Sequence, residues 1–312
     1  MSSEKDNIVL WHPSKKKFYE NFFFELHDPE GRFSFLGRYT LQNQGGETNG
    51  SVWGLFFDRV QKKQIVLHND FAADKVVTEA DFFFLDIGGS AIYHHGARAH
   101  LKEADQEMEW EFSWEPEGES LLLLPPLAYK LPFPKTKILT PNPRLRLSGR
   151  LRINGETFIL QDAVGQQSHA WGEEIHPSYH WGFANQFEGA DAVFEIGTTP
   201  LPRPIRGLSF VSAIVLRLDQ KTYLFNGPTD WFRNKNSISP THWHFEAKNK
   251  KTLLVGDLEA KPEEFAKLPF EQKTLLAQLH LELFTKEGDR WTKNRELVSN
   301  NASFEYDAKA FC

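Results

Sequence analysis

The sequence predicts a mainly β protein made of two antiparallel β-barrel or sandwich domains with little helix. Three observations lead to this fold class. Apolar and polar residues alternate with a period of two along most of the 312 residues. Helix start signals are scarce, and a proline-rich segment divides the chain near its middle. Many short strands without intervening helices favour sandwiches or barrels over a doubly wound sheet.

The alternation is clearest where Met108, Trp110, Phe112 and Trp114 are separated by Glu, Glu and Ser. In a strand this order places four large apolar groups on one face and polar groups on the other, as in an antiparallel sheet with one solvated face. Similar patterns predict strands at Phe33–Leu41, Val52–Asp58, Gln64–His68, Leu145–Ile153, Glu156–Leu160, Trp181–Phe187, Ala192–Gly197, Leu208–Leu218, Thr222–Phe225 and Leu279–Phe284.

Turn signals connect several of these strands. Asn154-Gly155 lies between two alternating segments and predicts a type I′ hairpin, because both turn positions need a positive φ. Asp219-Gln220 and residues 287–289 are weaker signals of the same kind. The best helix candidate begins near Pro262, where proline and two acidic residues suit a first turn, and it ends before Pro269.

Six prolines between Pro125 and Pro143 predict an extended connector, because proline cannot donate to a central sheet ladder. We therefore expect an N-terminal domain over residues 1–143, with 125–143 as its connector, and a C-terminal domain over residues 144–312.

Composition excludes several classes of function. The net charge is −6, so no global positive field attracts nucleic acid. The single cysteine, Cys312, excludes a disulfide framework and a CxxC motif, and the charged start of the chain does not resemble a secretory signal. No apolar stretch approaches the ~20 residues of a membrane-spanning helix. We expect a cytoplasmic protein without a transmembrane segment, and composition leaves its oligomeric state undetermined.

The segment 162–187 is the richest in functional residue types. In an extended strand Trp181, Phe183, Asn185 and Phe187 share one face. A lone Asn among aromatic residues is either a satisfied core amide or a polar anchor in an apolar pocket. The 27 Phe and 9 Trp of the chain likewise fit either a packed core or the wall of a large apolar cavity.

Two motifs in this segment, HxWG (His169, Trp171, Gly172) and WGFANQF (181–187), resemble the second-domain signature of the tocopherol cyclase, carotenoid 1,2-hydratase and AttH-like group. The first half is similar to the same group in FYENFFFELHDPEGRFSFLGRYTL and WGLFFDR, with Phe22-Phe23-Phe24 where a Trp-Tyr pair is usual. The resemblance implies two lipocalin-like domains with a hydrophobic pocket, and it implies cofactor-free enzymes that act on isoprenoid or polyene substrates.

Cyclisation or hydration of an alkene begins with protonation, which needs a buried acid, and the resulting cation needs aromatic faces and exclusion of water. His169 is the first candidate for the proton donor or for the group that orients an acid. The candidate catalytic residues are His169, Asp162, Glu173 and Glu195, with Glu174 as a further nearby acid. The candidate ligand-binding residues are Trp171, Trp181, Phe183, Asn185, Phe187, Tyr179 and His180. Taken singly, each aromatic residue is more commonly a core residue than a ligand contact.

A metal site is a separate hypothesis. His242, His244 and Glu246 alternate on one strand face and offer imidazole and carboxylate ligands, but the sequence pairs no third segment with them. The alternative is an exposed polar face with Trp243 and Phe245 inward. We therefore expect no metal and no cofactor.

Two functions of different class follow. The chain is a cofactor-independent cyclase, hydratase or isomerase that acts on a bulky isoprenoid, polyene or lipid-like molecule, or it is a non-catalytic carrier or sensor of such a molecule. An enzyme needs a buried acid within reach of the bound alkene, whereas a carrier needs only shape and an anchor. In both cases the expected partner is a hydrophobic small molecule and not nucleic acid.

Overall fold

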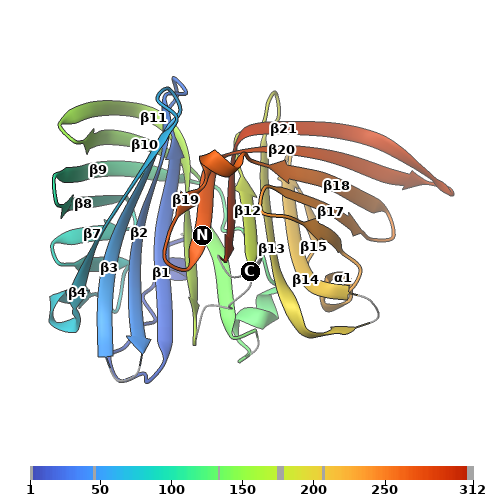
Figure 1. Ribbon diagram of the computed structural model, residues 1–312. Coiled ribbons are helices and arrows are strands. Elements are labelled where there is room, and N and C mark those ends of the chain that lie inside the picture. Colours follow the sequence, from blue (N-terminus) through green and yellow to red (C-terminus); the bar gives the residue numbers. More distant parts are fainter. Residues whose placement is uncertain (1–2, 45–46, 133, 174–178, 206–207, 308–312) are drawn as a thin grey trace. The chain divides into compact units, whose positions relative to one another are not determined.

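The computed structural model describes residues 3–44, 47–132, 134–173, 179–205 and 208–307, and the chain divides into two compact units (Figure 1). Unit 1 contains residues 1–122 and 127–175, and unit 2 contains residues 123–126 and 176–312. Nearly all regular structure in both units is antiparallel strand, which confirms the predicted fold class.

Within the described residues, unit 1 is built on an eleven-stranded sheet with the order β4-β3-β2-β1-β11-β10-β9-β8-β7-β6-β5. Its strands are β1 (Phe18–His27), β2 (Phe33–Gln44), β3 (Glu47–Asp58), β4 (Lys63–Ala72), β5 (Val76–Thr78), β6 (Phe84–Ile87), β7 (Ser90–Tyr93), β8 (Gly96–Glu103), β9 (Gln106–Glu117), β10 (Thr136–Ile153) and β11 (Glu156–Gly172). Short 3-10 turns are η1 (Ser3–Asn7), η2 (Ala73–Lys75) and η3 (Pro126–Tyr129).

This sheet curls into a nearly closed barrel, and an amide side chain joins strands from its two halves. Asn69 of β4 donates through Nδ2 to the carbonyl oxygen of Lys102 in β8 at 3.1 Å, and its Oδ1 accepts from the Lys102 N–H at 3.3 Å. Inside, alternate residues of β1 pack with the aromatic face of β9 in one core that includes Phe22, Phe24 and Trp110.

Unit 2 holds a ten-stranded sheet among its described residues, in which β15-β14-β13-β12-β21-β20-β18-β17-β16 are neighbours and β19 pairs with β20. Its strands are β12 (His180–Ala184), β13 (Ala192–Ile205), β14 (Leu208–Leu218), β15 (Lys221–Phe225), β16 (Lys235–Ile238), β17 (His242–Lys248), β18 (Thr252–Glu259), β19 (Ala266–Lys267), β20 (Glu271–Glu287) and β21 (Arg290–Asp307). The helix α1 (Pro228–Trp231) and the 3-10 turn η4 (Pro262–Glu264) are short.

The strongest turn signals are confirmed. Asn154 and Gly155 connect β10 to β11 with φ of 49° and 89°, the left-handed geometry that a type I′ turn requires. Asp219 and Gln220 connect β14 to β15 with φ of 48° and 67°. The helix expected near Pro262 is a single 3-10 turn, because β19 and the hairpin to β20 follow at once.

The boundary between the units lies after Ile175, not at residue 143, so the predicted domain limits of 1–143 and 144–312 are displaced. β10 and β11, expected in the second domain, belong to the sheet of unit 1. The proline-rich segment misleads because its later part joins the sheet. Pro141 and Pro143 are in β10, whose pairing with β11 shifts register between Leu139 and Leu145, and such irregularities accommodate residues without an N–H donor.

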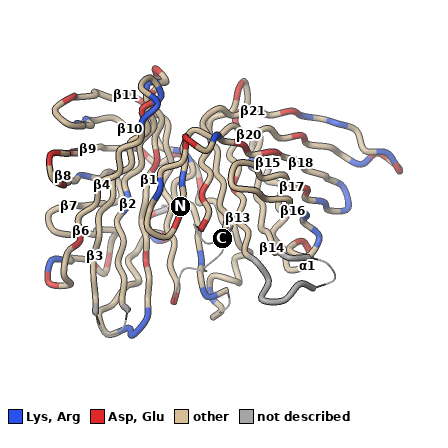
Figure 2. Tube along the Cα trace, viewed as in Figure 1, with Lys and Arg blue, Asp and Glu red and all other residues tan. Residues whose placement is uncertain are grey.

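Charged residues of both signs lie close together on the outer hairpins of the two sheets (Figure 2). In unit 1 the polar face of β9 forms cross-strand ion pairs such as Arg150–Glu109 at 3.3 Å and Arg146–Glu117 at 3.1 Å. These exposed ion pairs account for the charged residues that alternate with apolar residues around position 110. Within the part of the chain that the structure describes, no helix is long and apolar enough to cross a membrane.

Candidate functional site

A buried imidazole–carboxylate pair lies inside the barrel of unit 1. His169 on β11 and Glu20 on β1 face the interior, and their side chains are 1% and 0% exposed. His169 Nε2 is 2.8 Å from Glu20 Oε1. Two backbone N–H groups also donate to this carboxylate, from Leu10 at 2.9 Å and from Trp11 at 2.6 Å.

The hydrogen bonds define where the protons of the pair lie. His169 Nδ1 is 2.8 Å from the backbone carbonyl oxygen of Asp6, which can only accept, so Nδ1 carries a hydrogen. Nε2 faces Glu20 Oε1, so one further proton lies between these two atoms, either as imidazolium with carboxylate or as imidazole with carboxylic acid. The pair therefore holds one proton in a hydrogen bond that is buried from water.

Aromatic rings surround the pair. The ring of Phe22 stacks on His169 with centroids 4.3 Å apart, and Trp171 lies on the same imidazole with centroids 4.6 Å apart. Phe83 extends this layer by packing against Phe22 at 5.0 Å. Such faces can stabilise a cation that forms nearby.

Residues 4–12, which we call the N-terminal strap, cover the pair. Besides the bonds to Glu20 and His169, Asn7 donates to Gln167 Oε1 at 2.9 Å, and Trp11 Nε1 donates to Asn43 Oδ1 at 2.7 Å. Glu20 thus has two roles, because the same carboxylate holds the strap and shares the proton of His169.

A pocket of about 350 Å³ opens in the same unit. Its lining combines apolar rings with charged groups, namely Glu4, Phe82, Phe83, Phe84, Ala91, Tyr93, His94, His95 and Arg98. The volume is within the range of small-molecule sites. Phe83 belongs both to the pocket wall and to the aromatic layer, so the pocket is separated from His169 by Phe83 and Phe22.

Most of the other predicted residues lie in unit 2. Trp181 and Phe183 stack with centroids 5.8 Å apart on one face of β12, and Trp181 Nε1 donates to Glu195 Oε1 at 3.0 Å. Glu195 is 0% exposed, whereas the described candidate acids Asp162 and Glu173 are exposed. Its contact with Trp181 joins a candidate acid to a candidate aromatic residue.

A charged cluster adjoins this face. Lys273 Nζ lies 4.7 Å from the centre of the Trp181 ring and 2.7 Å from Glu305 Oε2. The Tyr179 hydroxyl contacts Glu271 Oε2 at 2.6 Å and also contacts Glu305. The Tyr179 hydroxyl therefore lies between two carboxylates, one of which also pairs with Lys273.

His180 faces the opposite side of β12, inside the core of unit 2, among the rings of Phe210, Trp243 and Tyr306. Burial lowers the pKa of His180 to about 4. An imidazole in this position is neutral at physiological pH, which fits a core role.

The stability of unit 2 should therefore depend on His180 in mild acid. Its pKa is lower in the folded state than in the unfolded chain, near 6.5, so its contribution is complete above pH 6.5 and is lost as the pH falls toward 4. Between pH 7 and pH 4.5 we expect the free energy of unfolding to fall by about 2 to 3 kcal/mol. In His180→Phe this fall should be absent. Urea unfolding at the two pH values measures this fall. His100→Phe replaces an exposed histidine and should show the same fall as the unsubstituted protein.

Two candidate acids are placed on the surface. Asp162 is exposed at a positive φ of 53°, where β11 is irregularly paired, and Glu173 is exposed and bonded to Lys135 at 3.0 Å. Neither provides the buried acid that the chemistry needs. Glu174 lies outside the described residues.

Asn185 and Phe187 follow β12 and are buried, at 4% and 9% exposure. Phe187 packs with Ala184 in the apolar core of unit 2 and does not share the face of Trp181 and Phe183 as the sequence predicted, because β12 ends at Ala184. The predicted residues are therefore divided, with His169 and Trp171 in unit 1 and the remaining aromatic residues in unit 2.

Glu20 was not predicted as a functional residue from the sequence. A signal was present, since Glu20 occupies an inward position in the alternating series Phe18, Glu20, Phe22 and Phe24. A carboxylate on an apolar stripe is costly unless it is bonded or functional. The residues of the N-terminal strap show no comparable sequence pattern that would predict their role.

The fold matches known structures across nearly the whole chain. A candidate AttH protein from Nitrosomonas europaea has a TM-score of 0.60 at 11% identity, with coverage of 96% of this chain and 94% of that one. Kievitone hydratase from Nectria haematococca has a TM-score of 0.61 at 8% identity, with 100% and 97% covered. CghA in complex with Sch210972 has a TM-score of 0.53 at 10% identity, with 94% and 89% covered.

These likenesses confirm, for the fold, the resemblance to the AttH-like group that the sequence motifs indicate. No protein-family model and no curated protein matches the sequence.

Proposed function

We propose that the protein binds a bulky apolar small molecule of isoprenoid, polyene or lipid-like character and catalyses a cofactor-free hydration, cyclisation or isomerisation at a carbon–carbon double bond. The observation that carries the proposal is the buried Glu20–His169 pair, with its one shared proton. The fold in common with kievitone hydratase and with CghA in complex with Sch210972 is compatible with this chemistry.

In the proposed reaction, the shared proton passes from the pair to one alkene carbon, and the π electrons form the new C–H bond. The neighbouring carbon becomes a cation, which the rings of Phe22 and Trp171 stabilise. For hydration, a water oxygen then adds to the cation and a water proton returns to Glu20, so the sum is addition of one water molecule. For isomerisation, a proton is lost from an adjacent carbon to the same carboxylate.

The pocket next to Phe83 is the proposed entry for the apolar part of the substrate, and Arg98 with His94 would face a polar end. Phe83 and Phe22 lie between this pocket and the proton, so substrate binding must move at least one of these two rings. The stacked Trp181 and Phe183 in unit 2 are a second proposed place of ligand contact.

A non-catalytic carrier is the second candidate, and one observation favours it. Neither Glu20 nor His169 lines the pocket, whose wall is largely Phe82, Phe83 and Phe84. A carrier needs this lining and an anchor such as Arg98, but no proton donor.

The experiment begins with mass spectrometry of the organic extract from the freshly purified full chain. The extracted molecule is then returned to ligand-free protein in D2O, and deuterium in C–H bonds is measured. Catalysis predicts deuterium uptake that falls at least tenfold in Glu20→Gln, which keeps an acceptor for the strap but holds no acidic proton. Glu25→Gln is the matched control, since Glu25 is also buried on β1 but faces the other side of the strand.

Three results separate the alternatives. Deuterium uptake that depends on Glu20 supports the enzyme. Binding without uptake supports the carrier, and an extract without any apolar molecule counts against both. Trp181→Ala, tested in the same extraction, shows whether unit 2 contributes to binding.

A further inference from the structure

A second cluster of chemically active side chains lies on the outer face of the β17–β18 pair in unit 2. The antiparallel register places His242 opposite Glu259 and His244 opposite Asp257. Because these positions alternate with core residues, all four side chains share the face away from Trp243 and Leu258. Two imidazoles and two carboxylates thus occupy adjacent positions on two neighbouring strands.

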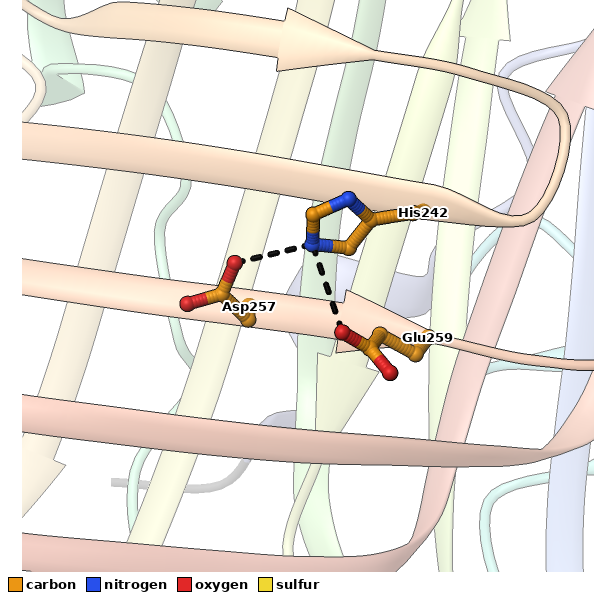
Figure 3. A group of neighbouring side chains, drawn as sticks. All are labelled: His242, Asp257 and Glu259. Atoms are coloured by element: carbon orange, nitrogen blue, oxygen red, sulfur yellow. Dashed lines mark hydrogen bonds and ion pairs between the residues drawn. The ribbon is translucent and has the colours of Figure 1, made fainter.

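The side chains converge (Figure 3). His242 Nε2 lies 2.8 Å from Asp257 Oδ1 and 3.4 Å from Glu259 Oε1. His244 Nδ1 lies 2.9 Å from the same Asp257 oxygen. One ligand atom from each of His242, Asp257 and Glu259 lies within 4.8 Å of the other two.

We propose that His242, His244, Asp257 and Glu259 bind a divalent transition-metal ion of the zinc class. Imidazole nitrogen and carboxylate oxygen are ligands for such ions at about 2.0–2.2 Å, commonly in a tetrahedral set of four. Without metal, a hydrogen on each imidazole bonds to Asp257. On binding, each hydrogen moves to the other nitrogen of its ring, so the lone pairs of His242 Nε2 and His244 Nδ1 become available.

The backbone beneath the cluster is held in register. A Cβ at Gly256 would lie 2.2 Å from the Phe245 ring, so this ring fills the space beside the glycine and packs the two strands together. Core packing therefore fixes the backbone beneath the four ligands, which reduces the ordering cost of binding an ion.

The cluster differs from other imidazole–carboxylate pairs among the described residues. His100 bonds Glu107 at 2.6 Å and His280 bonds Glu296 at 2.9 Å, each with a single imidazole. Glu246, which the sequence placed with the two histidines, instead bonds Lys235 at 3.0 Å. The structure supplies the partner strand that the sequence did not reveal, β18 with Asp257 and Glu259.

Zinc titration of the full chain without a histidine tag, followed by calorimetry near pH 7.5, tests the proposal. We expect one equivalent to bind, with affinity at least tenfold weaker in His244→Ala and in Asp257→Asn, which preserves side-chain shape. His100→Ala removes an exposed imidazole that also bonds a carboxylate and should leave affinity unchanged. Co²⁺ in place of zinc should give the intense visible absorption of a four-coordinate site.

The results either support or overturn the site. Stoichiometric binding that His244→Ala and Asp257→Asn both weaken, with circular dichroism unchanged, supports it. No heat of binding, or binding that these variants leave intact, overturns it. Loss of binding in His100→Ala to the same degree would equally overturn it, because the metal would then be held elsewhere.

Discussion

Replacing Glu305 by alanine is expected to lower the free energy of unfolding of unit 2 by about 4 kcal/mol. The Lys273 side chain is 0% exposed, and its ammonium group loses a carboxylate oxygen 2.7 Å away. The Tyr179 hydroxyl loses one of its two carboxylate contacts at the same time. A buried charge that loses its countercharge costs far more than a surface pair contributes. Urea unfolding followed by tryptophan fluorescence measures the change.

Two controls define the cause. Glu246→Ala breaks a pair of similar length with Lys235, but its partners are 39% and 72% exposed, so it should cost no more than about 1 kcal/mol. The double variant Lys273→Met with Glu305→Leu should regain most of the stability, because it removes both charges. A loss below about 1 kcal/mol in Glu305→Ala would contradict the interpretation.

Glu20→Leu is expected to release the N-terminal strap. The leucine side chain cannot accept from the N–H groups of Leu10 and Trp11 or from His169, and unmade hydrogen bonds cost about 1–3 kcal/mol each. We expect a loss of about 3 kcal/mol in the stability of the strap, which corresponds to roughly a hundredfold faster amide exchange over residues 4–12. Hydrogen exchange with mass spectrometry measures it.

Glu20→Gln separates this structural role from catalysis. The amide oxygen can still accept from the strap, so exchange should change by less than about tenfold while deuterium transfer to substrate is lost. Equal exchange in wild type and Glu20→Leu would show that other contacts, such as Trp11 with Asn43, hold the strap.

The fold was accessible from the sequence because its signals are local. Period-two alternation over Met108–Trp114 and the positive-φ turn at Asn154-Gly155 act over a few residues, and both are confirmed. The domain boundary was not accessible, because β11 pairs with β1, which is distant in the chain. Proline density indicated a connector at 125–143, whereas bulges allow part of it to join the sheet.

The candidate site, like the fold, was predictable only where its signals are local in the sequence. The motif around His169 identifies one half of the proton-sharing pair, but its partner, Glu20, lies about 150 residues earlier and becomes its neighbour only through the pairing of β1 with β11. Likewise His242 and His244 were visible as an alternating pair, while Asp257 and Glu259 joined them only through the β17–β18 register. Residue spacing along one strand does not predict which strand lies beside it.

The pairing of β1 with β11 also has a consequence during synthesis. β1 can pair with β2 as soon as both have left the ribosome, but residues 164–172 of β11 follow about 140 residues later. At roughly 5–20 residues per second, one edge of β1 waits about 7 to 30 s for its partner. That edge carries Phe22-Phe23-Phe24, an aggregation-prone run, between Glu20 and Glu25. Before Glu20 holds the strap, Glu20 and Glu25 therefore flank this run as charged gatekeepers that keep the nascent edge strand from pairing with other chains.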